Sequence, residues 1–269
     1  MATFKTRKPV DPHVLMLDVT GSERISPNVV RVTLGGEGLE RFTPLGFDQW
    51  FRLFLPRPGQ DTLKLPTRTS GLWYAQYLAT AKPKRPFVRN YTVRGFRPGA
   101  LDIDFVVHVE PDGASGPAAT FALNAKPGDQ VGLLDQGVGY NPRHDHDWTL
   151  LVADETGLPA VAGICASLPE DARGLAIVEL PSLEDRQEFR VPAGVTLSWV
   201  ARDGGHGVPG QLALETLRAA ELPAGAVYAY LVGESALVTG GRRHLVEQHQ
   251  VPKGNVDFIG YWRHGHAAM

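Results

Sequence analysis

Cysteine is almost absent from this chain, since Cys165 is the only one in 269 residues. A single thiol cannot form an intrachain disulfide or a cysteine-based zinc cluster. Long apolar runs are also missing, so no segment is expected to span a membrane. The first eight residues carry charge and lack the apolar stretch of a signal peptide. We therefore expect a cytoplasmic protein that does not insert into membranes.

The chain also lacks an excess of charge of either sign. Its 27 Lys and Arg residues nearly balance 29 Asp and Glu residues, for a formal net charge of −2. Nothing in this balance indicates binding to nucleic acid, so any site for an anion must be built locally. His144 and His146 lie close together without a nearby third histidine or a cysteine, and we expect no metal site there.

The pattern of the sequence changes at about residue 144. Residues 1–143 contain short β-branched or aromatic segments separated by turns rich in Gly, Pro and Asp. This pattern predicts a closed antiparallel β-barrel, with one helix that begins at Gly116 and ends at Asn124. The expected strands are residues 14–20, 29–34, 50–55, 91–94, 101–109 and 130–134.

Residues 144–269 alternate between strands and helices, which predicts a five-stranded parallel sheet with helices on both faces. The expected strands are 149–153, 175–180, 196–200, 227–231 and 256–259, and the expected helices are 158–168, 210–220 and 235–248. Ligands of such sheets bind beyond the carboxyl ends of the strands, where the strand order reverses. We therefore predict two domains, a barrel at residues 1–143 and an α/β domain at residues 144–269.

Residues 205–210 match the G-x-G-x-x-G pattern of a dinucleotide-binding turn between a strand and a helix. The match follows the third strand of its domain rather than the first, and Pro209 interrupts it, so it is a weak indication. The loops after the first and fourth strands, 154–157 and 233–235, should instead meet where the strand order reverses, and we expect a nicotinamide cofactor there. Arg202 ends the third strand and is a candidate for binding a ribose 2′-phosphate. An ordinary surface arginine fits the pattern equally well.

The segment Arg89-Asn90-Tyr91-Thr92-Val93-Arg94 overlaps an expected strand. We expect Arg89, Tyr91 and Thr92 to share one face of this strand and to offer a cation, an aromatic ring and a hydroxyl group. A flavin dinucleotide has phosphates, a planar heterocycle and heteroatoms that match these groups. The alternative is an ordinary strand with a tyrosine in the core and two arginines at the surface.

Seven segments, in the same order across nearly the whole chain, resemble the siderophore-interacting proteins, a branch of the ferredoxin-reductase type of flavoenzyme. The resemblance implies FAD as cofactor, NADPH, NADH or ferredoxin as electron source, and a ferric siderophore as substrate. Reduction would release the iron, because hard oxygen donors hold Fe(III) far more tightly than Fe(II). The segments are Arg89-x-Tyr91-Thr92-x-Arg94, Asp104-Phe-Val-Val-His108, Gly116-Pro117-Ala118, Asp154-Glu155-Thr156-x-Leu158-Pro159-Ala160, Gly233-Glu234-Ser235, Arg242-Arg243-x-Leu245 and Gly260-Tyr261-Trp262-Arg263-x-Gly265.

The resemblance also implies a role for individual residues. Tyr91 would pack on the isoalloxazine ring, Thr92 would bond to the edge of that ring, and the pyrophosphate would lie where Gly116 begins a helix, since free N–H groups favour an anion there. No general acid or base is needed, because the flavin carries the chemistry. The implied cofactor-binding residues are Arg89, Tyr91, Thr92, Arg94, Asp104, Val106, His108, Gly116, Pro117, Ala118, Thr120, Asp154, Glu155, Thr156, Arg202, Gly233, Glu234, Tyr261 and Trp262.

Two arginines are the implied ligands of the ferric siderophore. Arg52 lies on a barrel strand, and Arg263 lies in the C-terminal tail, which should be near the flavin. A few cations at an open barrel mouth would suit bulky, anionic iron chelates. The chain departs from the family pattern at residues 135–139, which leaves a third cation open; the candidates are Lys64, Arg68 and Lys126. Two other functions fit the sequence: a flavin reductase that serves a partner protein, and a siderophore-binding accessory without a flavin.

Overall fold

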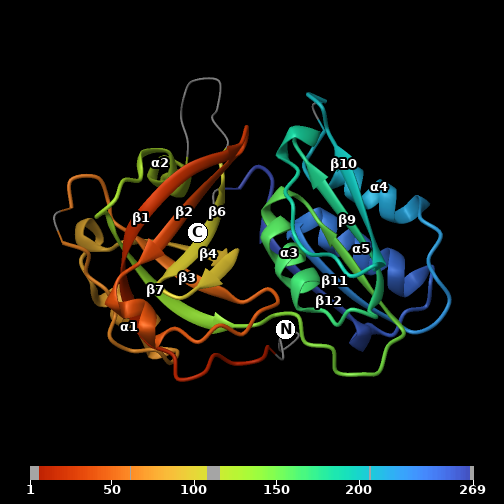
Figure 1. Ribbon diagram of the computed structural model, residues 1–269, viewed down its shortest axis with the longest axis horizontal. Coiled ribbons are helices and arrows are strands. Elements are labelled where there is room, and N and C mark those ends of the chain that lie inside the picture. Colours follow the sequence, from red (N-terminus) through yellow and green to blue (C-terminus); the bar gives the residue numbers. More distant parts are fainter. Residues whose placement is uncertain (1–5, 61, 108–115, 206, 267–269) are drawn as a thin grey trace. The chain divides into compact units, whose positions relative to one another are not determined.

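A computed structural model of the chain describes residues 6–60, 62–107, 116–205 and 207–266. The chain divides into two compact units, residues 1–139 and 140–269. This division falls just before residue 143, where the sequence predicts the end of the first domain. Each unit is built around its own sheet, which has seven strands in the first unit and five in the second. Figure 1 shows the helices and strands of both units.

The first unit contains one antiparallel sheet in the strand order β4-β3-β7-β1-β2-β6-β5. The sequence does not predict the short strand β5, and it places the start of β4 too late. Strands β4 and β5 lie at the two ends of the order, so closure of the barrel stays a prediction. The strands are β1 (Val14–Ser26), β2 (Val29–Gly35), β3 (Trp50–Leu55), β4 (Phe87–Thr92), β5 (Gly95–Arg97), β6 (Ala100–Val106) and β7 (Gln130–Gly137).

Alternate residues of these strands form the core of the first unit. Leu15, Leu17 and Val19 of β1 are almost fully buried, while the residues between them are more exposed. The same alternation in β2, β3, β6 and β7 directs side chains into one shared interior. Helix α2 (Pro117–Asn124) packs against this interior through Ala122, which is 1% exposed. The unit also has two 3-10 turns, η1 (Glu37–Arg41) and η2 (Lys82–Lys84).

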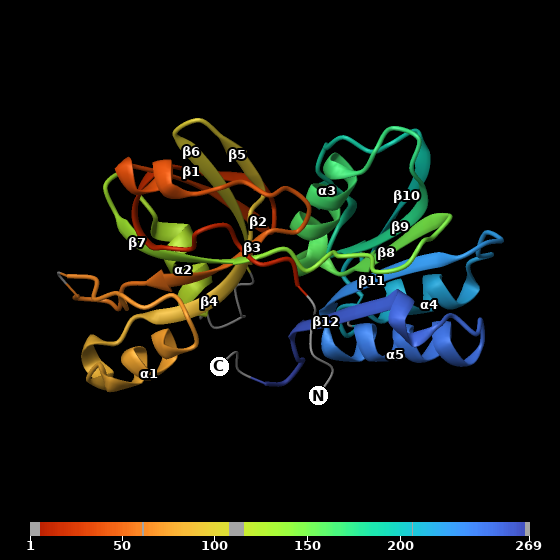
Figure 2. The same cartoon turned by 90° about the horizontal axis from the view of Figure 1, so that it is seen from below.

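Helix α1 (Leu72–Ala79) packs on the outer surface of the first sheet (Figure 2). Trp73 meets Phe54 edge-on, with ring centroids 5.9 Å apart, and Tyr77 packs against the same small cluster. The sequence predicts α2 as the only helix before residue 143, so α1 is a correction. The sequence pattern of α1 is a weak indication of a helix, because α1 has only eight residues and only two aromatic residues, one turn apart, point inward. Tyr74, which lies between them, is exposed.

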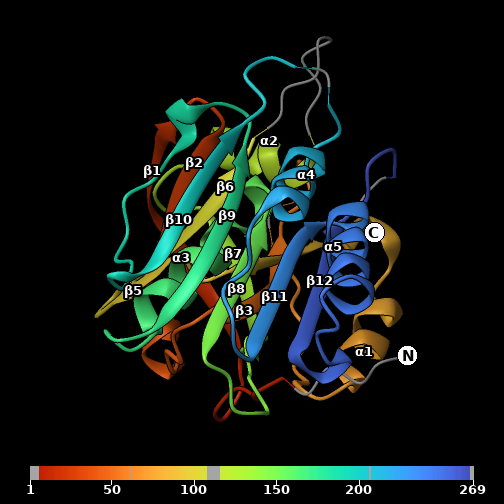
Figure 3. The ribbon, with the colours of Figure 1, turned by 90° about the vertical axis from the view of Figure 1, so that its right-hand side faces the viewer.

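The second unit contains a parallel sheet in the order β10-β9-β8-β11-β12 (Figure 3). The order reverses between β8 and β11, which places the carboxyl ends of these two strands side by side. All eight residues of β11 are buried, as expected for a central strand covered on both faces. The strands are β8 (Trp148–Ala153), β9 (Arg173–Leu180), β10 (Gly194–Ala201), β11 (Val227–Glu234) and β12 (Val256–Trp262), close to the predicted ones.

Helices cover both faces of the second sheet. Figure 2 shows α3 (Leu158–Ser167) on one face and α4 (Gln211–Ala219) and α5 (Ser235–Glu247) on the other. Cys165 of α3 is 0% exposed, and burial raises the pKa of its thiol to about 11. None of the described helices is both long enough and apolar enough to cross a membrane. Three 3-10 turns complete the unit: η3 (Glu155–Gly157), η4 (Leu183–Asp185) and η5 (Lys253–Asn255).

Candidate cofactor and substrate sites

Strand β4 carries the segment that the sequence predicts to bind a flavin. Tyr91 pairs with Phe51, and Arg89 pairs with Leu53, so both side chains lie on the face of the sheet that contains the core. The ring of Tyr91 contacts that of Phe105, with centroids 4.4 Å apart, and burial raises the pKa of the Tyr91 hydroxyl. The Nη1 atom of Arg89 donates a hydrogen bond of 2.7 Å to a neighbouring carbonyl oxygen. Tyr91 and Arg89 therefore share one face, as predicted.

Thr92 lies on the other face of β4. It pairs with Trp50, whose neighbour Phe51 points into the core, and it is 7% exposed. The prediction that Arg89, Tyr91 and Thr92 share one face is therefore wrong. Consecutive residues of a strand alternate between the two faces of the sheet, so Tyr91 and Thr92 cannot point the same way.

Asp104 and Arg94 belong to an ion-pair network on the outer face of β2 and β6. Arg31 holds Asp104 with two hydrogen bonds, from Nε to Oδ1 at 2.7 Å and from Nη2 to Oδ2 at 2.9 Å. The Nε atom of Arg94 lies 3.4 Å from Oδ2 of the same carboxylate. Hydrogen bonding to Asp104 raises the pKa of Arg31. Arg31 is not among the residues predicted from the sequence, because its position opposite Asp104 follows only from the pairing of β2 with β6.

Helix α2 begins with Gly116-Pro117-Ala118, the segment predicted to hold a pyrophosphate. Gly116 is the N-cap residue with an extended backbone, and Pro117 occupies the first turn. No side chain of the described residues caps this helix, and Gly116, Pro117 and Thr120 are exposed. The first turn of a helix favours an anion, so α2 has the property on which the prediction rests. Val106 is half-buried at the end of β6, and His108 lies outside the described residues.

Arg52, the predicted siderophore ligand on β3, lies beside two indole rings on the outer face of the first sheet. Its guanidinium carbon is 4.6 Å from the ring centroid of Trp73 and 5.7 Å from that of Trp50. Its Nε atom donates a hydrogen bond of 3.2 Å to Oε1 of Gln136, and burial lowers the pKa of Arg52. Arg52 is therefore a half-buried cation backed by aromatic rings.

The other candidate cations for the substrate are more exposed than Arg52. Lys64 and Arg68 are exposed, and the ammonium group of Lys126 lies 3.3 Å from a carboxylate in the same turn. Arg263 is exposed and follows β12 in the second unit. Arg52 and Arg263 belong to different units, so their joint role in binding a siderophore stays a prediction.

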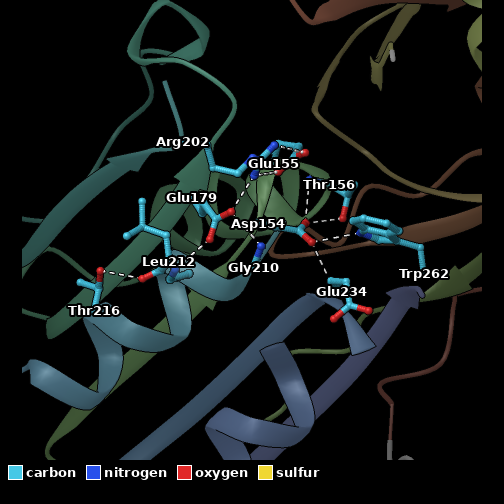
Figure 4. A network of polar contacts seen from close by, with 11 residues as sticks. Asp154, Glu155, Thr156, Glu179, Arg202, Gly210, Leu212, Thr216, Glu234 and Trp262 are labelled. Carbon is cyan, nitrogen blue, oxygen red and sulfur yellow. Dashed lines mark hydrogen bonds and ion pairs between the residues drawn. The ribbon is translucent and has the colours of Figure 1, made fainter. Parts of the chain in front are cut away.

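In the second unit, the ends of β8, β11 and β12 meet at the carboxylate of Asp154 (Figure 4). Its Oδ1 atom accepts hydrogen bonds from the backbone N and the Oγ1 of Thr156 at 2.9 and 2.5 Å. Its Oδ2 atom accepts from the backbone N of Glu234 at 2.7 Å and from Nε1 of Trp262 at 3.0 Å. Asp154 is 0% exposed, so one buried carboxylate joins three strand ends. The loops after β8 and β11 therefore meet as the sequence predicts.

Gly233 leaves room for this carboxylate. Its φ is +125°, and a Cβ atom at this position would lie 2.6 Å from Cγ of Asp154, so only glycine suits the position. Burial and the charge of Glu155 raise the pKa of Asp154 to about 7, while the hydrogen-bond donors around it favour its charged form. Asp154 and Gly233 thus depend on each other for their geometry.

Arg202 is held by two carboxylates at the ends of β8 and β9 (Figure 4). Its Nη1 and Nη2 atoms donate to the two carboxylate oxygens of Glu155 at 3.0 and 2.8 Å, and Nη1 also donates to Oε1 of Glu179 at 2.6 Å. Its side chain is 11% exposed, so Arg202 is not an ordinary surface arginine. Burial lowers the pKa of Arg202, but the hydrogen bonds and charges of the two glutamates outweigh burial and raise it overall.

Glu179 is not among the residues predicted from the sequence, yet it caps helix α4. Its Oε1 and Oε2 atoms accept hydrogen bonds of 2.8 Å from the backbone N–H groups of Gly210 and Ala213. Gly210 has a φ of +89°, and a Cβ atom there would lie 2.8 Å from Cβ of Leu237, which explains the last glycine of the G-x-G-x-x-G match. The sequence could have indicated that Glu179 has a buried partner, because it is the only charged residue in the apolar run 175–180.

Glu234 caps helix α5 and holds the start of the C-terminal tail. Its Oε2 atom accepts hydrogen bonds from two N–H groups in the first turn of α5, and Oε1 accepts from the backbone N of His264 at 3.1 Å. Tyr261 is 37% exposed, and Trp262 is half-buried. The turn η3 and the helices α4 and α5 therefore each begin at a carboxylate of their own unit.

Two family descriptions together match almost the whole chain. Residues 18–139 match the siderophore-interacting FAD-binding domain, and residues 146–265 match the siderophore-interacting protein family. The ferric vibriobactin reductase of Vibrio cholerae is 31% identical over 258 residues, which cover 93% of this chain and 89% of that protein. This chain belongs to the siderophore-interacting protein family.

This siderophore-interacting protein is also 30% identical to the NADPH-dependent ferric-chelate reductase of Escherichia coli, with 91% of each chain covered. A solved siderophore utilization protein from T. fusca is 33% identical, with 97% of each chain covered and a TM-score of 0.82. More distant solved structures, ferredoxin reductases among them, share the fold at 12–17% identity and TM-scores of 0.58–0.63. The resemblance is thereby confirmed, and so is the predicted fold class of an antiparallel β domain followed by a five-stranded parallel α/β domain; closure of the barrel stays a prediction.

Proposed function

We propose that this siderophore-interacting protein is a flavin-dependent ferric-siderophore reductase. It takes electrons from NADH or NADPH and reduces the Fe(III) of a siderophore, so that iron leaves as Fe(II). The observation that carries the proposal is the start of α2, which no described side chain caps and which lies in the unit that matches an FAD-binding domain. FAD, when bound, supplies the link between the two-electron chemistry of the dinucleotide and the one-electron reduction of iron.

The first unit offers contacts that suit FAD. The N–H groups at the start of α2 bind the pyrophosphate, and the charge of Arg89 supports them. Tyr91 presents a half-buried ring from the same face of β4 as Arg89, and burial raises the pKa of its hydroxyl. Because Thr92 lies on the opposite face, we assign the contact between β4 and the flavin to Tyr91 and Arg89.

The second unit offers a place for the electron donor. The loops after β8 and β11 are joined through Asp154 and Glu234 at the reversal of strand order, where sheets of this kind bind nucleotides. The name of the Escherichia coli relative supports a nicotinamide dinucleotide as donor. Reduced ferredoxin is the rival donor.

The substrate is an anionic ferric siderophore, and Arg52 attracts it. The guanidinium group of Arg52 is partly accessible and lies beside the half-buried ring of Trp50, which offers apolar surface to an aromatic or aliphatic chelate, while the buried ring of Trp73 lies against the cation. The name of the Vibrio cholerae relative supports a siderophore as the chelate.

Anaerobic spectroscopy tests the proposal. The purified protein should bind FAD, NADH or NADPH should bleach the flavin absorbance, and a ferric siderophore should restore it while a ferrous chelator captures Fe(II). A protein that binds no FAD would be the siderophore-binding accessory instead. Reduced flavin that does not reduce ferric chelates but does reduce a partner protein would indicate a flavin reductase. Reduction by ferredoxin alone would replace the proposed donor.

The role of Arg52 can be tested separately from the flavin. Arg52→Gln should lower kcat/KM for an anionic ferric siderophore about tenfold at low ionic strength, because a cation near the substrate speeds encounter and orients the chelate. The loss should shrink as salt is added. Lys84→Gln, which removes an exposed cation from the same unit, is the matched control. Equal losses in both variants, or none in Arg52→Gln, would show that Arg52 has no specific role.

A further inference from the structure

Arg202 occupies the position from which an arginine could distinguish NADPH from NADH. The two coenzymes differ in the 2′-phosphate of the adenosine ribose, which an arginine near the strand ends accommodates in sheets of this kind. Here the guanidinium group of Arg202 already makes three hydrogen bonds to Glu155 and Glu179. A phosphate at Arg202 would have to share this group with the two carboxylates or displace them.

The charges around Arg202 oppose a phosphate. One guanidinium group faces two carboxylates, so the cluster of Arg202, Glu155 and Glu179 has a net charge of +1 − 2 = −1. The side chains of Glu155 and Glu179 are only 2% and 0% exposed, so water and salt screen their charges poorly. An approaching phosphate therefore meets a cation that is already neutralised and a site that is negative overall.

The neighbouring helix starts do not compensate. The first N–H groups of α4, which would otherwise favour a phosphate, donate to Glu179. Those of α5 donate to Glu234. Glu179 thus holds both Arg202 and the start of α4, two groups that could otherwise bind a phosphate.

We propose that Arg202 is a positioning residue rather than a phosphate ligand, and that Glu155 and Glu179 determine the choice of coenzyme. Arg202 orients the two glutamates, and Glu179 in turn holds the start of α4. The protein therefore uses NADH at least as efficiently as NADPH. This inference rests on the proposed function, because it takes a nicotinamide dinucleotide as the ligand of this edge.

Binding of two adenosine nucleotides to the wild-type protein tests the inference without any redox reaction. 5′-AMP and 2′,5′-ADP differ in the 2′-phosphate, and titration calorimetry on the full-length FAD-loaded protein gives both affinities. We expect 2′,5′-ADP to bind no more tightly than 5′-AMP, since no charge-assisted contact is gained and the cluster is negative overall. A wild-type protein that binds 2′,5′-ADP about tenfold more tightly would overturn the inference. The exposed Arg186, in the loop after β9, would then be the next candidate.

Variants show whether the glutamates are responsible. Glu155→Gln leaves Arg202 with one carboxylate fewer, and it should raise the affinity for 2′,5′-ADP relative to 5′-AMP about tenfold. Adding Arg202→Gln should abolish this gain. Glu184→Gln removes an exposed carboxylate from the loop after β9 and should leave the ratio unchanged. A gain that persists without Arg202, or an equal gain in Glu184→Gln, would overturn the inference. The wild-type measurement decides even if a variant folds poorly.

Flavin reduction separates this inference from the proposed function. A kcat/KM for NADPH about tenfold above that for NADH would overturn the inference and leave the proposed function intact. Failure of both dinucleotides to reduce the flavin would instead remove the proposed donor. A protein that binds neither 5′-AMP nor 2′,5′-ADP would overturn the inference as well, because it requires a dinucleotide at this edge.

Discussion

Helices α2 and α4 both begin at a glycine, Gly116 in the first unit and Gly210 in the second, but the N–H groups of their first turns have different partners. In α4, Glu179 accepts hydrogen bonds from Gly210 and Ala213. In α2, no side chain of residues 6–60, 62–107, 116–205 and 207–266 acts as a cap. A helix start whose N–H groups donate to a side chain of the same protein stabilises the fold. A helix start without such a cap leaves its N–H groups and its dipole able to bind an external anion.

The backbone at the two glycines differs in the same way. Gly210 has a positive φ and no room for a side chain, so the fold requires glycine there. Gly116 has an extended backbone, and a Cβ atom at this position would meet no atom of the described residues within 4 Å. On the proposed function, we expect the first unit to contact the phosphates of FAD and the second unit to recognise parts of a dinucleotide other than the 2′-phosphate. Variants of both helix starts, and of the carboxylates near α4, test this expectation.

Removal of the Asp154 carboxylate should have the largest effect. Asp154→Ala leaves buried donors from Thr156, Glu234 and Trp262 without their acceptor. We expect the free energy of unfolding to fall by about 3 kcal/mol or more, measured by urea titration. Asp145→Ala removes an exposed carboxylate just before β8 and should change it by less than about 0.5 kcal/mol. Equal urea midpoints for Asp154→Ala and the wild type would contradict a structural role for this carboxylate.

Loss of the cap on α4 should have a smaller effect. Glu179→Gln replaces a carboxylate oxygen that accepts from Gly210 or Ala213 with an amide nitrogen, and it should lower the free energy of unfolding by about 1–2 kcal/mol. Hydrogen exchange at the Ala213 amide should speed up accordingly. Glu184→Gln is again the matched control. Unchanged protection of the Ala213 amide would mean that Glu179 is not needed to hold the start of α4.

A carboxylate added to α2 should have the smallest effect on stability and a specific effect on FAD. Gly116→Asp gives α2 the kind of cap that α4 has, so it should weaken FAD binding about tenfold, through repulsion and competition for the N–H groups. Gly116→Asn, a cap of similar size without charge, should weaken it less. Fluorescence titration of the FAD-free protein gives both affinities. Equal FAD affinity for the aspartate variant and the wild type would separate the start of α2 from the pyrophosphate.

Most elements of the second unit could be predicted from the sequence, because each strand and helix carries a clear pattern of its own. The meeting of Asp154 with Glu234 follows from topology, since β8 and β11 are neighbours at the reversal of strand order. In the first unit, β5 has only three residues and is too short to show alternation. The sequence alone is enough to predict that Thr92 and Tyr91 lie on opposite faces, because consecutive residues of a strand alternate between the two faces.

The partners of individual side chains could not be predicted. The sequence around Arg202 is compatible with binding to a phosphate or to a carboxylate. Which of the two it binds depends on Glu155 and Glu179, which lie at the ends of two other strands. The pairing of Arg31 with Asp104 likewise depends on the register between β2 and β6. Sequence patterns give the direction of a side chain along its own element, whereas its partners come from the packing of distant elements.

Cys165 provides a natural reporter for opening of the second unit. It is the only thiol of the chain, it is 0% exposed in α3, and its pKa of about 11 leaves little thiolate at neutral pH. A thiol reagent should therefore react only after α3 has separated from the sheet, when the pKa returns to its ordinary value. The labelling rate then measures how often this unit opens, without an engineered probe and without signal from the first unit. Labelling rates measured by absorbance, one for each carboxylate variant, could thus rank the variants by their effect on the local stability of this unit.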